Sequence, residues 1–188
     1  MLGWSWRART VREWLFVSGT RRSGSGGRAG SHDGGTMAGV MVVEDEQVIA
    51  EDLARSLMTL GYEVTGMATT AEECVKGAGQ RRPDLVLMDI RLAGELDGID
   101  AARLLREHFD VPVIFLTAYA DEETLRRAKL TGPSGYLVKP FRKSELRGAV
   151  EAGLLRHRME SQLRRSERRY CATLRAIERA FRYTSGPV

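Results

Sequence analysis

The sequence predicts an α/β fold, a doubly wound parallel sheet of five strands with helices on both faces. From Met37 onward, short apolar runs alternate with longer segments whose apolar residues recur at helical spacing. Strands that alternate with helices favour parallel βαβ units and a sheet that is covered on both faces. Gly61, Pro83 and the Gly132-Pro133 pair separate these segments. The alternating pattern has the length of one domain.

Five short apolar runs are the predicted strands, at residues 40–43, 62–67, 85–88, 111–116 and 135–138. The helices between them have their own start signals. Thr69, with Glu72 three residues later, predicts a capping box at the start of the second helix. Asp121 can cap the fourth helix, and the fifth begins near Lys143. The order of elements is therefore strand, helix, five times over.

The net charge of +4 conceals three segments of different charge. Residues 1–36 have a balance of +4, residues 37–141 of −7 and residues 142–182 of +7. We expect residues 1–36 to be a disordered leader. Met37 stands just before the first predicted strand, so an over-extended start-site assignment would explain the leader. No apolar run reaches the roughly 18–20 residues of a membrane span. Two distant cysteines form no metal-binding spacing, so we expect a cytoplasmic protein.

Five polar residues stand where the predicted strands end. Glu44 and Asp45 follow the first strand, Asp89 ends the third, Thr117 follows the fourth and Lys139 the fifth. In open α/β sheets the ligand site lies beyond the carboxyl ends of the strands, so these side chains are expected to converge. Clustered carboxylates suit Mg²⁺, and the hydroxyl and ammonium can stabilise a phosphoryl group in transfer. The set predicts phosphoryl transfer with one aspartate as nucleophile.

The motifs around these residues resemble the receiver domains of two-component response regulators. The motifs are Val42-Val43-Glu44-Asp45-Glu46, Leu87-Met88-Asp89, Leu116-Thr117-Ala118-Tyr119 and Gly135-Tyr136-Leu137-Val138-Lys139-Pro140. The resemblance covers residues 37–158. It implies a flavodoxin-like sheet of strand order 2-1-3-4-5 with five helices, the last extended. It also implies that Asp89 accepts a phosphoryl group from a phosphohistidine of a sensor histidine kinase in a phosphorelay.

The resemblance assigns a metal to the site. It implies that Mg²⁺ is held by Glu44, Asp45 and Asp89 and by the backbone carbonyl of Arg91, with Glu44 acting through water. Such a domain phosphorylates and dephosphorylates itself and is a signalling module rather than a turnover enzyme. A phosphatase of the haloacid-dehalogenase kind is the rival enzyme class, but it needs a second aspartate where this chain has Arg91.

The resemblance also implies a switch. Lys139 would pair with Asp89 and then with the phosphoryl group. The peptide bond between Lys139 and Pro140 would be cis. Thr117 would move toward that group and Tyr136 would turn inward behind it. The surface of the fourth helix, fifth strand and fifth helix would then change its partners. The alternative for Tyr136 is an ordinary half-buried strand aromatic.

The loop after Asp89 departs from the common family pattern. Residues 90–98 lack the usual proline and contain one extra residue. This variant resembles receivers that are linked to PAS and histidine-kinase modules. Arg91 and Tyr119 lie where side chains of the family control access of water, which suggests slow dephosphorylation.

Residues 159–188 are predicted to be an extended helix or linker stub without an output domain. Its apolar residues Leu163, Tyr170, Leu174, Ile177 and Phe181 are spaced like the seam of a coiled coil. One alternative function is a truncated receiver–PAS or hybrid-kinase fragment that dimerises through this helix. Another is a regulator that contacts DNA through the basic helix, which we regard as the weaker alternative because no base-reading motif is visible. A homodimer through this helix, or through the fourth helix, fifth strand and fifth helix, is expected.

Overall fold

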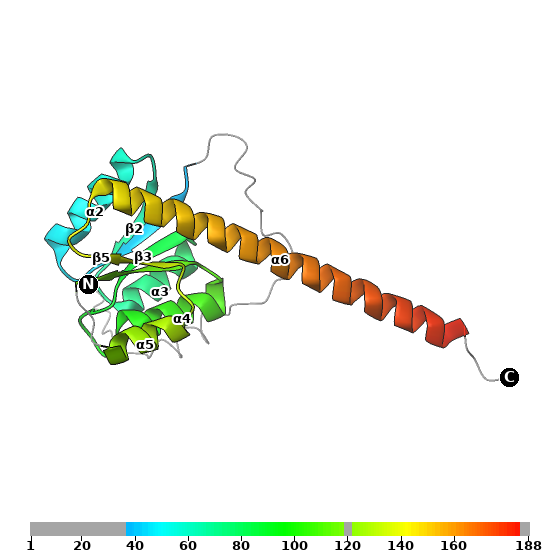
Figure 1. The fold of residues 1–188 in the computed structure, drawn as a ribbon. Helices are drawn as coiled ribbons and strands as arrows, with labels where there is room; N and C mark the ends of the chain where they lie inside the picture. Colours follow the sequence, from blue (N-terminus) through cyan, green and yellow to red (C-terminus); the bar gives the residue numbers. More distant parts are fainter. Residues whose placement is uncertain (1–36, 119–121, 185–188) are drawn as a thin grey trace, which may run out of the picture.

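The computed structural model describes residues 37–118 and 122–184 (Figure 1). The predicted leader, Tyr119 and the predicted cap Asp121 lie outside these residues. The strands are β1 (Gly39–Val43), β2 (Glu63–Ala68), β3 (Leu85–Asp89), β4 (Val113–Thr117) and β5 (Gly135–Val138). The helices are α2 (Gln47–Thr59), α3 (Ala71–Gln80), α4 (Gly98–Phe109), α5 (Glu122–Leu130) and α6 (Lys143–Thr184). The predicted alternation of strands and helices is confirmed.

The five strands form one parallel sheet in the order β2-β1-β3-β4-β5. In the register of the sheet, Val42 of β1 lies beside Leu87 of β3, and Leu87 lies beside Ile114 of β4. The pairing of β1 with β2 shifts by one residue between Val40 and Met41. The predicted fold class and strand order are confirmed. The strand order reverses between β1 and β3, so their carboxyl ends border the crevice in which such sheets bind ligands.

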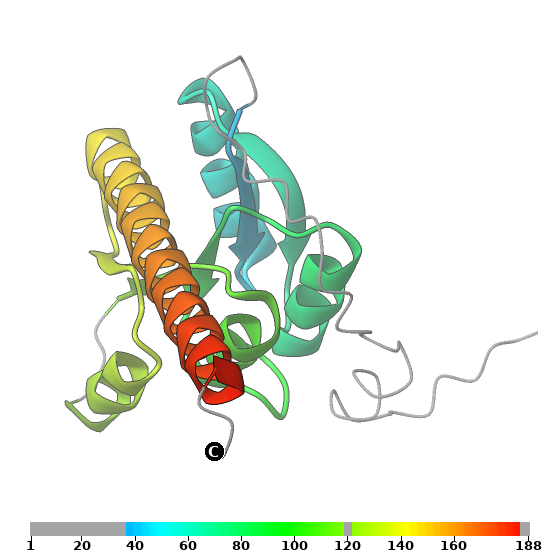
Figure 2. The ribbon, with the colours of Figure 1, turned by 90° about the vertical axis from the view of Figure 1, so that its right-hand side faces the viewer.

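Helices cover both faces of the sheet, and each face has its own core (Figures 1 and 2). On one face, Leu53 and Leu57 of α2 and Leu146 and Val150 of α6 pack against alternate strand residues such as Leu87. On the other face, residues of α3, α4 and α5 pack against the remaining strand residues, among them Val43, Met88 and Phe115. Because both faces are covered, four of the strands read as nearly continuous apolar runs instead of alternating ones.

Two helix ends show how local sequence sets the element boundaries. Gly61 has φ +87° just after α2, a left-handed conformation that favours glycine, as the predicted helix end requires. The predicted capping box of Thr69 and Glu72 is wrong by one residue. The Thr70 hydroxyl accepts from the amide of Glu73, and the Glu73 carboxylate accepts from the amide of Thr69. Thr70, whose backbone is extended, is therefore the N-cap of α3.

The last helix is much longer than the others. α6 runs for 42 residues from Lys143 to Thr184, crosses one face of the sheet and then projects beyond it (Figures 1 and 2). It continues without interruption across residue 158, where the receiver-like part of the sequence was expected to end. Within the described residues, no helix has both the length and the apolar character that a membrane crossing requires.

Candidate functional site

The acidic pair follows β1 at the carboxyl edge of the sheet. The backbone of Glu44 continues the pairing with β2, since its amide donates to the Ala68 carbonyl at 3.0 Å. This pairing directs the Glu44 side chain inward, where only 1% of the residue is exposed. Asp45, the next residue, is exposed. One carboxylate is therefore buried at the base of the site, and its neighbour stands at the rim.

Asp89 ends β3 and is held by the loop that follows. One of its carboxylate oxygens accepts a 2.8 Å hydrogen bond from the backbone amide of Arg91. The loop then folds back, and the amide of Gly98 donates to the Ile90 carbonyl at 3.1 Å. A side chain at position 98 would collide with the backbone carbonyl oxygen of Asp89. Glycine at the start of α4 thus lets that helix approach the site closely.

Lys139 joins the two ends of the site. Its backbone amide donates to the carbonyl of Thr117 at 2.7 Å, which fixes the end of β5 against the end of β4. Its ammonium lies 2.5 Å from a carboxylate oxygen of Asp89 and 2.6 Å from one of Glu44. The bond between Lys139 and Pro140 is cis, as the resemblance implies. The ends of β1, β3 and β4 are therefore joined to the end of β5 through one residue, Lys139.

Glu44, Asp45 and Asp89 offer carboxylate oxygens that all lie within 4.8 Å of one another. One ammonium faces these three carboxylates, so the cluster keeps an excess of negative charge. Carboxylate oxygens are the ligands that a hard divalent cation such as Mg²⁺ prefers. The sequence predicted these residues as metal ligands, and the structure brings their side chains together. The donor set fits Mg²⁺.

The electrostatics of the buried pair follow from its surroundings. Burial is the largest effect on the pKa of the Glu44 carboxyl and raises it. The hydrogen bond from Lys139 lowers the pKa and the charge of Asp89 raises it, and the net direction is upward. Burial lowers the pKa of the Lys139 ammonium, but its hydrogen bonds to Asp89 and Glu44 outweigh this effect. The Lys139 pKa is raised above its ordinary value, so the lysine is charged at neutral pH. Removal of either partner would leave an uncompensated group near the site.

The two predicted switch residues lie beside this centre. Thr117 is buried at the end of β4. Tyr136 of β5 packs against the core, with its ring centroid 5.9 Å from that of Phe115. Its hydroxyl is buried and has no hydrogen-bond partner among the residues that the structure describes. Burial raises the pKa of Tyr136. The ring thus lies inward, as the half-buried strand aromatic of the alternative reading would also do.

Two features of the site have no counterpart in the sequence analysis. Arg91 was predicted to contribute its backbone carbonyl to a metal, but the contact that the structure gives is its amide on Asp89. Gly98 was not singled out, although no side chain fits at that position. Both features depend on the path of one loop. A sequence signal existed only for Gly98, because an Asp-Gly pair closes the loop.

Residues 40–151 match the family model of the response regulator receiver domain. The chain belongs to this family. The match includes all the predicted site residues, from Glu44 to Lys139. Receiver domains of response regulators work in two-component signalling and interact with histidine kinases.

Several known proteins are similar to this receiver domain. It is 40% identical over 119 residues to the transcriptional regulatory protein PdtaR of Mycobacterium tuberculosis, covering 63% of this chain and 58% of that protein. It is 38% identical over 116 residues to the phyllosphere-induced regulator PhyR of Methylorubrum extorquens, covering 61% of this chain and 43% of that one. The chain thus spans about half the length of these curated relatives.

Two solved structures are similar to this chain. The signal receiver domain of a modulated diguanylate cyclase from Desulfovibrio desulfuricans superposes with a TM-score of 0.64 at 39% identity, covering 66% of this chain and 99% of that one. A fusion that contains a trimeric coiled-coil segment of yeast Spc42 superposes with a TM-score of 0.62 at 29% identity. The fusion match covers 80% of this chain and 98% of that one.

Proposed function

We propose that this receiver domain accepts a phosphoryl group on Asp89, with Mg²⁺ bound by the acidic cluster and with the phosphohistidine of a sensor histidine kinase as donor. One observation carries the proposal. The Asp89 carboxylate has the Lys139 ammonium at 2.5 Å and oxygens of two further carboxylates within 4.8 Å, at the edge where such sheets bind ligands.

Each side chain has a distinct role in this proposal. Asp45 and Asp89 would hold the metal directly, Glu44 would support it through water, and the carbonyl of Arg91 would supply a further oxygen. The metal, when bound, offsets the charge of the phosphoryl oxygens as they approach the carboxylates. The Arg91 amide, which donates to Asp89, holds the nucleophile in one orientation.

The transfer step is an in-line displacement. An oxygen of Asp89 forms a new bond to phosphorus, and the bond between phosphorus and the histidine nitrogen breaks. The electron pair of that bond returns to the imidazole of the donor. Lys139 then exchanges its contact with the Asp89 carboxylate for one with a phosphoryl oxygen, and Thr117 hydrogen-bonds another. The phosphoryl group stays on Asp89 of the domain itself, so the domain acts as a switch and not as a turnover enzyme.

The switch uses residues that connect the site to the surface of α5, β5 and α6. Thr117 and Tyr136 lie on the neighbouring strands β4 and β5, and the end of β5 hydrogen-bonds to Thr117. Movement of Thr117 toward the phosphoryl group would vacate space beside the Tyr136 ring. The unpaired hydroxyl of Tyr136 supports two positions of similar energy, because the buried position leaves a polar group unsatisfied. The surface formed by α5, β5 and α6 then changes its partner preference.

Intact-mass measurement tests the proposal. The full chain is incubated with Mg²⁺ and a small phosphodonor such as acetyl phosphate. We expect one phosphoryl group per chain, stable to acid and labile to base, and none after chelation of the metal. Asp89→Asn abolishes the adduct, whereas Asp52→Asn, an exposed acid on α2, leaves it unchanged. An adduct that persists in Asp89→Asn, or a folded wild-type chain that gains none, would contradict the proposal.

A further inference from the structure

The first half of α6 has an inner face that packs on the receiver. Leu146 and Val150 are buried in the core beneath it. One turn later, a side chain at Gly153 would meet methyl groups of Leu85 and Ile114 at 3.0 Å. Beyond this point, His157 and Arg164 are still partly covered. The inner face therefore extends from the start of the helix to residue 164.

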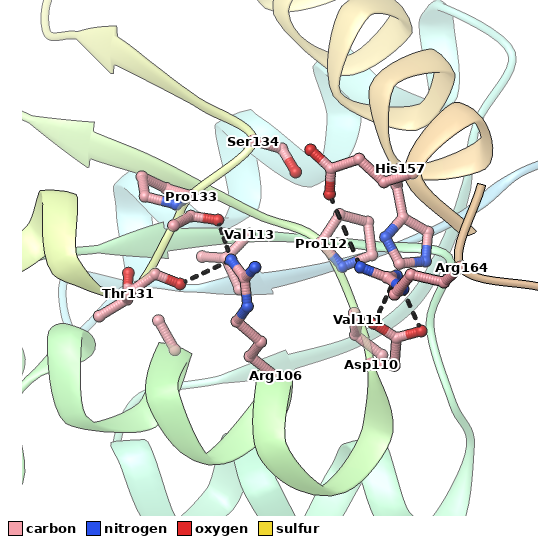
Figure 3. A pocket seen from close by; sticks show the side chains of 13 residues that line it. Arg106, Asp110, Val111, Pro112, Val113, Thr131, Pro133, Ser134, His157 and Arg164 are labelled. Carbon is pink, nitrogen blue, oxygen red and sulfur yellow. Dashed lines mark hydrogen bonds and ion pairs between the residues drawn. The ribbon is translucent and has the colours of Figure 1, made fainter. Parts of the chain in front are cut away.

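An ion pair fixes the end of this inner face (Figure 3). The guanidinium of Arg164 contacts both carboxylate oxygens of Asp110, at 2.9 and 3.1 Å. Asp110 ends α4 with φ 51°, and its backbone carbonyl accepts a hydrogen bond from Arg82. Figure 3 shows the His157 ring beside this pair. Because α6 packs on the core as far as Leu154 and reaches this ion pair at residue 164, its opposite side faces away from the receiver.

That opposite side carries a row of apolar residues that are exposed in the part of the chain that the structure describes. We call it the outer row; it consists of Leu155, Met159, Leu163, Tyr170 and Leu174. Each is at least 43% exposed, and Met159 is 62% exposed. At about 100° per residue, these positions lie on the side of the helix away from Val150, His157 and Arg164. Large apolar side chains gathered on one exposed face mark an interaction surface.

The spacing of the outer row follows a second period. From Leu155 the steps are four, four and three residues, and Ser166 fills the one polar position before Tyr170. The same steps then lead on to Leu174, and the next two positions of the repeat in the sequence are Ile177 and Phe181. This is an 11-residue repeat, not the heptad suggested by the spacing of the last five residues alone. An 11-residue repeat keeps a contact face aligned in a nearly straight or slightly right-handed supercoil.

Charges on the two flanks of the outer row indicate what covers it. Arg158, Arg165 and Arg169 lie on one flank, and Glu160 and Glu167 lie on the other. Two residues are exceptions: Glu151 lies on the flank of the arginines, and Arg156 lies on the flank of the glutamates. Arg156 forms an ion pair with Glu160 on its own flank. In a parallel pair of identical helices, unlike flanks face each other, whereas in an antiparallel pair each flank faces its own copy. The segregation of charge therefore favours a parallel arrangement.

We propose that α6 pairs in parallel with α6 of a second copy of this chain through the outer row. The partner is a second copy because the repeat and the flanking charges are self-complementary about a twofold axis. The packing of Leu146, Val150 and Leu154 on the core presents the row outward, and so orients the two receivers relative to each other. The proposal does not depend on phosphorylation of Asp89.

Light scattering on the full chain tests the pairing. We expect the mass of two chains for the wild type. Leu174→Glu puts a charge into the row, so we expect dissociation to monomers, or a dissociation constant raised about tenfold or more. Ala172→Glu is the matched control, since it adds the same charge two residues away on an exposed, unrelated side of α6. A monomeric or trimeric wild type, or equal effects of the two substitutions, would overturn the proposal.

Disulfide trapping tests the direction of pairing. In a Cys171→Ser background, cysteine is introduced at position 155 or 166, one 11-residue repeat apart. A parallel pair brings each position opposite its own copy, within the short Cα separation that a disulfide requires. We expect Leu155→Cys and Ser166→Cys each to form covalent dimers under mild oxidation. An antiparallel pair can align only one of them, so efficient trapping of one and not the other would overturn the parallel arrangement.

Discussion

Glu44 has the least favourable surroundings of the charged groups at the site. Its carboxylate is buried, lies beside Asp89 and has Lys139 as its paired cation. A buried carboxylate is retained at a cost in free energy unless a partner compensates it. The position suits a group whose purpose is to attract a cation, because bound Mg²⁺ would offset the same repulsion. Stability without metal and affinity for metal are thus opposed at this residue.

The raised pKa of Glu44 predicts a dependence of stability on pH. Its folded pKa lies above the ordinary value of 4.5, so the folded state holds this proton more tightly than the unfolded chain. In metal-free buffer, the wild type should gain free energy of unfolding relative to Glu44→Gln as the pH falls from 7 toward 4.5. Urea denaturation of both proteins across this range measures the difference. A difference that stays constant, or that shrinks toward acid, would show that Glu44 is not disfavoured as a carboxylate.

The residues that carry the chemistry of the site were predictable from the sequence, but the loop contacts that position Asp89 were not. Glu44, Asp45, Asp89, Thr117 and Lys139 each end a strand, and parallel strand ends meet at one edge. Their meeting therefore follows from topology alone. The contact of the Arg91 amide and the close approach at Gly98 depend on the path of a loop. No periodicity in the sequence specifies that path.

At the scale of single elements, α6 combines two environments along one helix. One side of its first turns packs on the sheet, whereas the opposite side of the same turns is exposed. Gly148 and Gly153, which are five residues apart, each lie in one of these two environments. Nothing lies within 4 Å of a side chain built at Gly148, whereas one at Gly153 meets two core side chains. The same substitution at these two positions should therefore have opposite effects.

Gly148→Ala should stabilise the protein by about 0.5–1 kcal/mol, because alanine loses less backbone entropy than glycine when the helix forms. Gly153→Ala should destabilise it by about 1–3 kcal/mol, because the added methyl overpacks Leu85 and Ile114. Urea denaturation monitored by circular dichroism measures both values. If both variants were stabilised, the close packing of α6 on the sheet would be contradicted.

The elements themselves were predictable to within one or two residues, and the errors have local causes. Thr69 and Thr70 each have a glutamate three residues later, so the capping-box pattern fits both. The choice of Thr70 depends on where the chain leaves β2, which is a tertiary property. The left-handed Asp110 at the end of α4 is likewise fixed by its contacts with Arg82 and Arg164.

At the scale of the whole molecule, the core and the projecting helix are separable. All residues of both core clusters lie between Val40 and Leu154 in the sequence. Beyond Leu154, α6 contacts the receiver through the partly exposed ion pair of Arg164 with Asp110. Pairs of this kind contribute about 0–1 kcal/mol. The receiver should therefore fold without the second half of α6.

A fragment of residues 37–158 should unfold in one cooperative transition, with a Tm within a few degrees of that of the full chain measured as a monomer. Leu174→Glu provides that reference, since it removes the proposed contribution of pairing. Thermal unfolding followed by circular dichroism at 222 nm measures both. A fragment without a cooperative transition would mean that residues 159–184 belong to the folding unit.

Chemical trapping of the modified residue tests the phosphoryl-acceptor role of Asp89 most directly. The full chain is phosphorylated with Mg²⁺ and acetyl phosphate, treated with borohydride, digested and sequenced by mass spectrometry. Hydride reduces an aspartyl phosphate to homoserine with loss of phosphate, which leaves a permanent mark on the accepting residue. We predict homoserine at position 89 alone, dependent on both the phosphodonor and the metal. Homoserine at position 45 or elsewhere, with an unmodified aspartate at 89, would contradict the assignment.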